Sequence, residues 1–441
     1  MTDHNTAFAD VTFTPSAGRT LGVEWELGLL DPLTLDLTSR ADDLLGHANA
    51  PEANSHARPT KSRSTVTKEL LRNTVEIVTG VCANAEEASA DLSGGLETVQ
   101  NAAEQLGILL YGGGAHPFAR WEDQQVSEGQ RYATLIDRTQ WWGRQMVIFG
   151  VHVHVGVRSA AKVWPLINGL LTFHPHLTAL SASSPYGSGA DTGYASNRTM
   201  LFQQLPTAGL PFQFETWAQY REYLRDVYTT GVITDPSELR WDIRPSLRLG
   251  TIEVRACDGL SRLQDVAAVA ALVHCLVTHL EQQLDEGILA RPLPPWHVQE
   301  NKWRAARYGL DAILIRDADN REVDVVDDIH DLLEQLQPTA RRLGCTQELA
   351  KIEDILRDGA GYQRMRSAVM ADGSGDLRAA VRSMLVPGPG SAAPSSAGIP
   401  VTARSTPRSA GSSAPDWPRS REQVPPAAPR GAGEPQGSPS E

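Results

Sequence analysis

Hydrophobic and polar residues alternate with a period of two in several short stretches of the chain. The clearest case is GVEWELGLLD, where Val23, Trp25 and Leu27 fall on one face of the expected strand. Glu24 and Glu26 fall on the other face. Glutamate is a poor strand former, and two like charges on one face repel each other. The pattern therefore predicts a strand whose two acids meet a positive charge.

The same alternation recurs in three further stretches. FGVHVHVGV places His152 and His154 opposite a row of valines, and GTIEVRACDG places Glu253 and Arg255 opposite apolar residues. NTVEIVTG places Glu76 between two apolar residues. If these strands belong to one sheet, their polar faces line a single cavity; the alternative is that the strands lie apart and their acids face water.

The periodicities along the rest of the chain mix strands with helices. The expected strands span 20–30, 73–80, 107–113, 146–157 and 238–257. The expected helices span 84–106, 125–145, 160–181, 214–228 and 261–286, with several more between 296 and 385. Because the spacing is not that of regular βαβ units, the fold class expected is α+β, with helices backing a mostly antiparallel sheet.

The charge balance limits the partners of the protein. The 441 residues include 53 acidic and 40 basic side chains, for a net charge of −13, and no basic run stands out. Nucleic acid is therefore not the expected partner, although nucleotides can bind if divalent metals supply the positive charge. The chain has no P-loop or dinucleotide-binding motif, and GGG at 112–114 reads as a turn.

Neither a membrane span nor a disulfide framework is expected. The most apolar run, 266–280, is too short to cross a bilayer and reads as a buried helix in which His274 and His279 are ordinary residues. The N-terminus lacks the apolar core of a signal peptide. The four cysteines are distant in sequence, which indicates reduced thiols in a cytoplasmic protein rather than a zinc knuckle or redox pair.

The composition changes near residue 387. From there the chain is rich in Pro, Ser, Gly and Ala, and such a segment cannot bury enough surface to fold. The expected organisation is a catalytic domain over 1–386 followed by a disordered tail over 387–441.

Carboxylates gathered in one cleft raise one another's pKa and destabilise the fold, and divalent cations remove that penalty. Oxygen ligands accompanied by a histidine suit Mg²⁺ or Mn²⁺. Glu69, seven residues before Glu76, is a further acid close enough in sequence to join such a site.

Six motifs in this order carry a family resemblance: GVEWE, GVHVHVG, SASSPYGSGADTGYASNR, RWDIRPS, GTIEVRACDG and ENKWRAARYGLDA. Together they resemble the carboxylate–amine ligases related to glutamate–cysteine ligase type 2, over about residues 18–385. The HVH and IEVR strands also resemble those of glutamine synthetase. The resemblance implies an antiparallel sheet that binds ATP with two or three Mg²⁺ or Mn²⁺ ions, small-molecule substrates and a homodimer.

The resemblance also implies a role for each matched residue. The implied metal ligands are Glu24, Glu26, Glu69, Glu76, His152 and Glu253. His154 matches the histidine nearer the ATP phosphates. Arg255 matches the arginine that faces the transferred phosphoryl group, and Arg244 looks like a second arginine for phosphate. Arg198 would reach nucleotide or substrate, the alternative being a solvated arginine at a helix start.

The implied reaction activates the γ-carboxylate of glutamate as an acyl phosphate and joins it to an amine such as cysteine, releasing ADP and phosphate. Two alternatives remain open from the sequence: a metal-dependent hydrolase and a non-catalytic nucleotide-binding regulator.

Some further residues have two interpretations each. His116 either contacts substrate or is structural. The cations of ENKWRAARYG either cap the cavity or form a solvated face, with Trp303 packed inward; they are Lys302, Arg304 and Arg307. Trp141 and Trp142 are expected in the core, the alternative being a platform for substrate.

Overall fold

The computed structural model describes residues 12–49 and 62–388. Contacts along the chain separate a unit at 1–396 from a unit at 397–441. The second unit, and all but the first two residues of the predicted tail, lie outside the described residues, so the tail stays a prediction.

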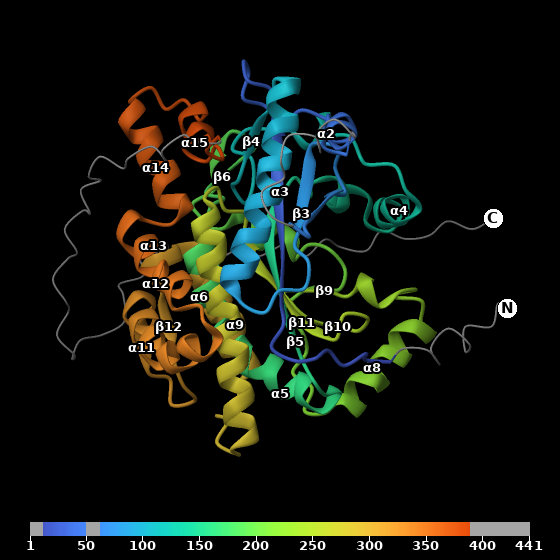
Figure 1. Cartoon of the computed structure of the whole chain (residues 1–441), viewed down its shortest axis with the longest axis vertical. Coiled ribbons are helices and arrows are strands. Elements are labelled where there is room, and N and C mark those ends of the chain that lie inside the picture. The colour runs from blue at the N-terminus through green and yellow to red at the C-terminus, as the bar shows by residue number, and fades with distance from the viewer. Residues whose placement is uncertain (1–11, 50–61, 389–441) are drawn as a thin grey trace, which may run out of the picture. The chain divides into compact units, whose positions relative to one another are not determined.

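A seven-stranded sheet forms the centre of the described unit (Figure 1). Its strands are β1 (Leu21–Leu30), β2 (Thr65–Lys68), β3 (Thr74–Val78), β4 (Leu109–Tyr111), β5 (Gly150–Gly156), β10 (Ile243–Ser246) and β11 (Thr251–Asp258). The order is β10-β11-β5-β1-β3-β2, β4 also pairs with β1, and every pairing is antiparallel. The α+β prediction is confirmed, and the antiparallel sheet disagrees with the parallel βα barrel of the hydrolase alternative.

Three two-stranded pairings lie outside the large sheet. They join β6 (Tyr186–Gly187) to β7 (Ala190–Asp191), β8 (Ala208–Gly209) to β9 (Arg240–Trp241), and β12 (Ile313–Ile315) to β13 (Glu322–Asp324). Of these, β8 and β9 are parallel.

The helices of the described unit follow the predicted ranges with a few differences. They are α2 (Ala41–Ala48), α3 (Ala85–Leu106), α4 (Gln130–Arg144), α5 (Ala160–Leu171), α6 (His174–Ser181), α7 (Asn197–Phe202), α8 (Trp217–Thr229), α9 (Leu263–Asp285), α10 (Pro295–Tyr308), α11 (Val325–Leu343), α12 (Thr346–Ala350), α13 (Ile352–Asp358), α14 (Gly361–Asp372) and α15 (Arg378–Ser383). The single helix predicted over 160–181 is wrong. It is divided into α5 and α6, and Pro175 occupies the first turn of α6, where its missing N–H costs nothing.

Helices α3 and α9 pack side by side against the apolar face of the sheet (Figure 1). Val23, Trp25 and Val153 on that face are at most 1% exposed. Helix α9 is long and apolar enough to cross a membrane, but 83% of its most apolar window is buried inside the protein. The prediction of a buried core helix is confirmed, and His274 there meets only the backbone oxygen of Arg19.

The expectation of reduced thiols agrees with the structure, but two of the cysteines, although distant in sequence, lie close together in space. Cys275 of α9 and Cys345 before α12 are both fully buried, and their sulfur atoms are 3.6 Å apart. The four cysteines are free thiols. Sequence distance did not reveal the pair, because α11 turns back and returns the chain to α9.

Candidate active site

The register of the sheet places the predicted polar residues on one face. Glu24 on β1 lies opposite His152 on β5, and Glu26 lies opposite Glu76 on β3. Glu253 on β11 lies opposite His154 on one side and opposite Arg244 on the other. The two-residue repeat therefore puts the apolar residues of four strands into the core and their acids, histidines and arginines on a common surface.

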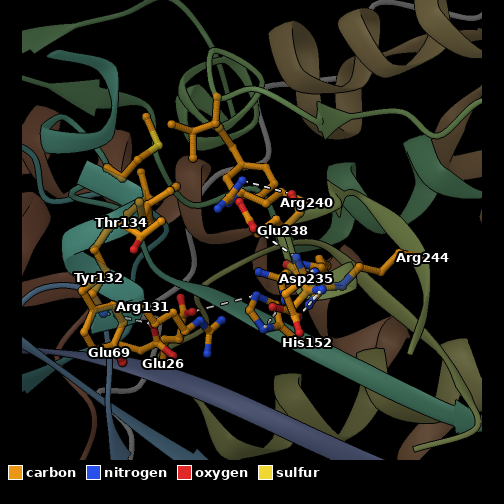
Figure 2. A pocket seen from close by; sticks show the side chains of 18 of the residues that line it. Glu26, Glu69, Arg131, Tyr132, Thr134, His152, Asp235, Glu238, Arg240 and Arg244 are labelled. Atoms are coloured by element: carbon orange, nitrogen blue, oxygen red, sulfur yellow. Dashed lines mark hydrogen bonds and ion pairs between the residues drawn. The ribbon is translucent and has the colours of Figure 1, made fainter. Parts of the chain in front are cut away.

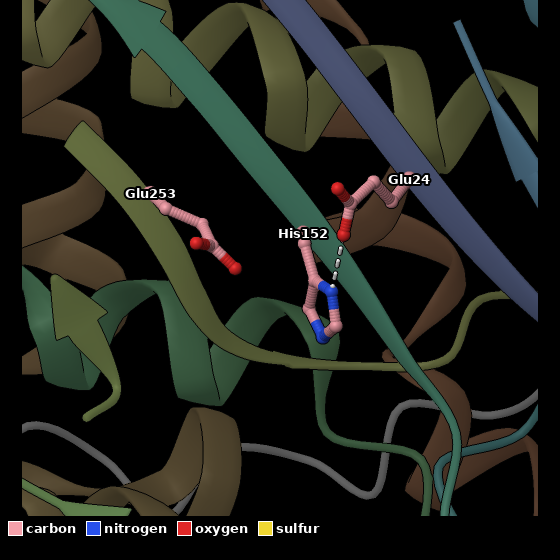
Figure 3. Close-up of side chains that lie close together, drawn as sticks. All are labelled: Glu24, His152 and Glu253. Carbon is pink, nitrogen blue, oxygen red and sulfur yellow. Dashed lines mark hydrogen bonds and ion pairs between the residues drawn. The ribbon is translucent and has the colours of Figure 1, made fainter. Parts of the chain in front are cut away.

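Two groups of potential metal ligands share His152. Atoms of Glu24, His152 and Glu253 lie within 4.8 Å of one another (Figure 3), and so do atoms of Glu26, Glu76 and His152. Carboxylate oxygens with one imidazole are a donor set that suits Mg²⁺ or Mn²⁺. Glu69 belongs to neither group, so the geometry supports its predicted ligand role less than it supports the others.

The first group carries its own positive charge. Glu253 accepts hydrogen bonds from Arg244 Nε at 2.8 Å and Nη2 at 3.2 Å, and it is also paired with Arg255. Burial would raise the pKa of Glu253, but the two arginines outweigh it and lower that pKa. Glu24 accepts from His152 Nδ1 at 2.9 Å and His154 Nε2 at 3.1 Å, which holds its pKa well below the usual value despite burial.

Among the described residues, the acids of the second group have weaker positive partners, since the nearest ion-pair contact of Glu26 is His152 Nε2 at 3.9 Å. Burial, with the nearby charge of Glu69, raises the pKa of Glu26 to about 8. Burial and the charge of Glu24 raise the pKa of Glu76 well above its usual value. Burial likewise raises the pKa of Glu69. Three buried or half-buried carboxylates that are short of positive charge fit the binding of a divalent cation.

The two histidines differ in charge. Burial, aided by the charge of Arg255, lowers the pKa of His152 to about 4, so its ring is neutral, the form that binds metals. Burial would lower the pKa of His154, but Glu253 and Glu24 outweigh it and raise that pKa. His154 is therefore suited to be a cation beside the two acids.

A bulge in β11 at Arg255 and Ala256 keeps Arg255 on the polar face and returns the next residues to the register of the core. The pairing with β5 shifts by one residue between Val254 and Cys257, and the Arg255 N–H donates to the oxygen of Asp242 at 2.7 Å. The extra residue lets Glu253 and Arg255 share the polar face while Cys257 returns to the core. The sequence gives no sign of this bulge.

A cavity of about 450 Å³ opens above the polar face (Figure 2). Six of the ten predicted site residues line it, namely Glu26, Glu69, His152, Arg198, Arg244 and Arg255. The other four lie beside them on the sheet. Glu24 is bonded to His152, Glu253 is bonded to Arg255, and Glu76 lies opposite Glu26. His154 is bonded to Glu24. The structure thus brings together all ten residues, without testing their roles.

The walls of the cavity contain residues that the sequence did not indicate. One wall is the start of α4, with Arg131 and Tyr132, and the other is the segment 234–240. Arg138 of α4 pairs with Glu238 and so ties the walls together. Arg240 also lines the cavity, where burial lowers its pKa to about 10. In the sequence, TDPSELRW runs directly into the motif RWDIRPS, and this adjacency was the signal that could have identified this wall.

Arg198 is 4% exposed, which contradicts the alternative of a solvated helix-start arginine. It lies in the first turn of α7 and donates to the backbone oxygen of Arg255. Among the described residues it has no ion-pair partner, and its Nε has no hydrogen-bond partner. A buried cation of this kind suits an anionic ligand.

Several residues interpreted from the sequence lie elsewhere. Trp141 and Trp142 are 58% and 44% exposed, so the core prediction is wrong; α4 bends at Gln140 just before them. His116 is buried and bonds only to backbone groups of Leu35, Phe118 and Ala119, which indicates a structural role.

The cations of ENKWRAARYG neither cap the cavity nor form one solvated face. Lys302 is 2% exposed and pairs with Asp242 at 2.7 Å, so it, rather than Trp303, points inward. Arg304 pairs with acids at the surface, and Arg307 donates to the oxygen of Gly193. The helical pattern could not distinguish a buried lysine from a solvated one, because the distant Asp242 decides it.

The family model described as glutamate-cysteine ligase family 2 matches residues 20–383. A protein of Mycolicibacterium vanbaalenii, provisionally named glutamate–cysteine ligase 2-1, is 54% identical over 375 residues, 85% of this chain and 95% of that protein. A Mycobacterium tuberculosis protein, provisionally named glutamate–cysteine ligase 2, is 53% identical over 378 residues, 86% of this chain and 97% of its own length.

Two solved structures share the fold at low sequence identity. A glutamate–cysteine ligase from Francisella tularensis in complex with AMP is 14% identical, with a TM-score of 0.58 over 84% of this chain and 88% of that chain. A bifunctional glutathione synthetase from Pasteurella multocida is 15% identical, with a TM-score of 0.56 over 82% of this chain and 51% of that chain.

Proposed function

Because the chain belongs to the glutamate-cysteine ligase family 2 and is therefore an ATP-dependent carboxylate–amine ligase, we propose that its carboxylate substrate is glutamate. The γ-carboxylate is activated as an acyl phosphate and then joined to an amine such as cysteine. The products are the amide, ADP and phosphate.

One observation carries this proposal: two groups of metal-ligand side chains share His152 on the floor of a cavity that arginines also line. The ligands for Mg²⁺ or Mn²⁺ would be Glu24, His152 and Glu253 for one ion and Glu26 and Glu76 for a second, with Glu69 available to a third. When bound, the ions offset the negative charge of the ATP phosphates.

The arginines of the cavity stabilise the groups whose charge changes during phosphoryl transfer. A carboxylate has no good leaving group; its oxygen attacks the γ-phosphorus of ATP, and ADP departs with the bonding electrons. Arg255 and Arg244 are held by Glu253, so their forks are oriented before the transferring phosphoryl group arrives. Arg198, and His154 with its raised pKa, are suited to add positive charge for oxyanions of the nucleotide or the amino acid.

The second step requires that water stays out. The amine attacks the acyl carbon, phosphate leaves, and the amine nitrogen loses a proton. Water would compete by hydrolysing the acyl phosphate. The cavity walls, α4 and the segment 234–240, are tied by Arg138 and Glu238 and would limit that access.

The remaining features of the proposal concern the cellular form of the enzyme. We expect a catalytic unit spanning residues 1–386 that acts on small molecules in the cytoplasm as a homodimer. The four free, buried cysteines suit a reducing compartment.

The test is ADP release by the purified protein with Mg²⁺ or Mn²⁺. Each amino acid is supplied alone, and then glutamate is paired with a panel of amines that includes cysteine. Release that requires glutamate together with one amine supports the proposal and identifies the acceptor. Glu253→Gln is the inactive control, with its folding checked by circular dichroism.

Two results would contradict the proposal. Release with an amine and a different carboxylate would replace glutamate as the substrate. Metal-dependent ATP binding without release for any pair would favour the nucleotide-binding regulator.

A further inference from the structure

Three sequence motifs meet at one buried carboxylate that has no role in the proposed function. They are GGG at 112–114, the segment 181–198 and the end of β11 at Cys257–Gly259. Their meeting point is Asp258, which is 1% exposed and lies three residues after Arg255. Asp258 does not line the cavity and belongs to neither group of metal ligands.

Three donors saturate the Asp258 carboxylate. Oδ2 accepts from Ser183 N at 2.9 Å and from Ser184 Oγ at 2.7 Å, and Oδ1 accepts from Ser196 Oγ at 2.8 Å. All three serines are fully buried. A buried carboxylate held on both oxygens has a fixed orientation and fixes its donors in turn.

The GGG motif makes room for this arrangement. A Cβ at Gly114 would lie 2.5 Å from Asp258 Oδ2, and a Cβ at Gly112 would lie 2.5 Å from the backbone of Leu260 and Ser261. Gly114 N donates to Ser183 Oγ at 2.8 Å, and Ser183 Oγ donates to Gly259 O at 2.7 Å. The motif is therefore more than a turn: its lack of side chains lets two backbone segments touch.

Two of the serines connect Asp258 to Arg198. Ser184 Oγ, while donating to Asp258, accepts from Arg198 N at 3.0 Å. Ser196 is the N-cap of α7, where its side chain accepts from Thr199 N. The first turn of α7, which carries Arg198, is thus held to Asp258 at two points.

The guanidinium of Arg198 fits closely at the cavity floor. A Cβ at Gly150 would lie 2.3 Å from Arg198 Nη2, so the side chain lies flat against β5. It donates to Arg255 O at 3.3 and 3.4 Å, and its Nε is left without a partner among the described residues. Only a fixed backbone keeps a long, flexible side chain in so narrow a place.

We propose that Asp258 is a positioning residue, which through Ser184 and Ser196 holds Arg198 in the orientation that meets an oxyanion of a substrate. The inference rests on the proposed function in that this oxyanion is a carboxylate of the amino acid or a phosphate of ATP. Asp258 touches neither substrate; its effect passes through Arg198 alone.

The test compares Asp258→Asn with a matched control, Asp91→Asn. Asp91 is also buried, at 6% exposure, and saturated: it accepts from Ser62 Oγ and from the backbone N–H groups of Arg63, Ser64 and Gly80. It lies on α3, away from the cavity lining. Both changes replace a buried carboxyl group by an amide of the same shape, but only Asp258 is connected to Arg198.

Steady-state ADP release separates the two oxyanion sources. Arg198→Ala identifies the substrate, glutamate or ATP, whose KM depends on Arg198. We expect Asp258→Asn to raise the KM of that same substrate about tenfold or more and to leave the other KM within about twofold. Asp91→Asn should leave both KM values within about twofold, whatever its loss in Tm.

A double variant tests whether the effect passes through Arg198. Adding Asp258→Asn to Arg198→Ala should raise the KM no further, because the positioned group is already gone. If the two substitutions multiply each other's effect on KM, Asp258 has a structural role that is independent of Arg198, and the inference is overturned. Ser184→Ala, which cuts the connection with a smaller change, should repeat the KM effect if Asp258→Asn folds poorly.

Crystal structures of the unliganded variants make the test independent of turnover. In Asp258→Asn the guanidinium of Arg198 should leave Arg255 O, and in Asp91→Asn it should stay. An unmoved Arg198 in Asp258→Asn would overturn the inference even if the enzyme is active. A wild-type protein without ADP release would refute the proposed function, while a displaced Arg198 would still support its positioning by Asp258.

Discussion

The two halves of the cavity floor use similar side chains but differ in their charge partners. Glu24 and Glu253 are paired with His154, Arg244 and Arg255, and the pKa values of both acids are lowered. In the other half the acids are Glu26, Glu69 and Glu76, whose pKa values are all raised.

This difference indicates how the polar face folds before any ligand arrives. The first half is held together by the protein's own cations. In the second half Glu26, with a pKa of about 8, keeps a proton at neutral pH that a bound divalent cation would displace, so metal binding and proton release are coupled there. Glutamates therefore belong to a preformed site in the first half and to a site that depends on a bound cation in the second half.

The largest effects should come from removing one acid from each half. Glu253→Gln and Glu76→Gln should each lower ADP release by roughly 10²–10³-fold, because each removes a ligand or the orientation of the arginines. Their effects on the metal-free fold should differ. Glu253→Gln leaves two buried arginines without their anion and should cost about 3 kcal/mol, whereas Glu76→Gln should change stability by less than about 1 kcal/mol.

Urea unfolding in EDTA and ADP-release assays measure both properties. Equal losses of stability in the two variants would remove the distinction between the halves. Full activity in either variant would mean that the replaced acid is not part of the active site.

The next effect is stabilisation by metal. Mg²⁺ or Mn²⁺ at a hundred times its Kd should stabilise the folded protein by about 2.7 kcal/mol and raise its Tm. Glu26→Gln should abolish most of this gain, because it removes a ligand from the cation-dependent half, while Asp91→Asn should keep it. Thermal melts with and without metal provide the measurement, and an unchanged gain in Glu26→Gln would contradict the assignment.

The pH dependence of the metal-free protein should be smaller but specific. The pKa of Glu26 is about 8 in the folded state, far above that of an unfolded carboxyl, so the folded state keeps a proton that the unfolded chain has lost. Stability should therefore fall as pH rises from 7 to 8.5, by up to about 1.4 kcal/mol per pH unit. The raised pKa of His154 acts in the same direction.

Replacing Glu26 and adding metal isolate the part of the pH dependence of stability that is due to Glu26. Above pH 7 the buried histidines with lowered pKa, such as His152, are nearly neutral in both states and add little slope. Glu26→Gln should flatten the decline, and saturating Mg²⁺ should do the same. Urea unfolding in EDTA at several pH values measures the free energy of unfolding. A free energy of unfolding that rises over this range would contradict the prediction.

The smallest effect should come from the C-terminal segment. Every residue that lines the cavity lies between Glu26 and Arg255. A chain ending at Gly388, which keeps the contact of Gln100 with the Pro387 oxygen, should retain kcat and both KM values within about twofold. A loss of activity greater than tenfold would place part of the segment in the site.

The sequence by itself determined which residues lie on the polar face of the sheet. The two-residue repeat is local, so it separated Glu24, Glu26, His152, His154 and Glu253 from their apolar neighbours without knowledge of the partner strands. The helices behind the sheet were also visible, because the apolar run that forms most of α9 can only be buried.

The tertiary structure decided what each of those residues meets. Charge balance depends on strand order and register, which set Arg244 beside Glu253 but leave Glu26 beside Glu76. The bulge at Arg255, the inward turn of Lys302 toward Asp242 and the meeting of three motifs at Asp258 likewise join residues far apart in the chain. Local periodicity fixes a face, whereas pKa, ligand grouping and positioning arise from non-local neighbours that only the folded chain brings together.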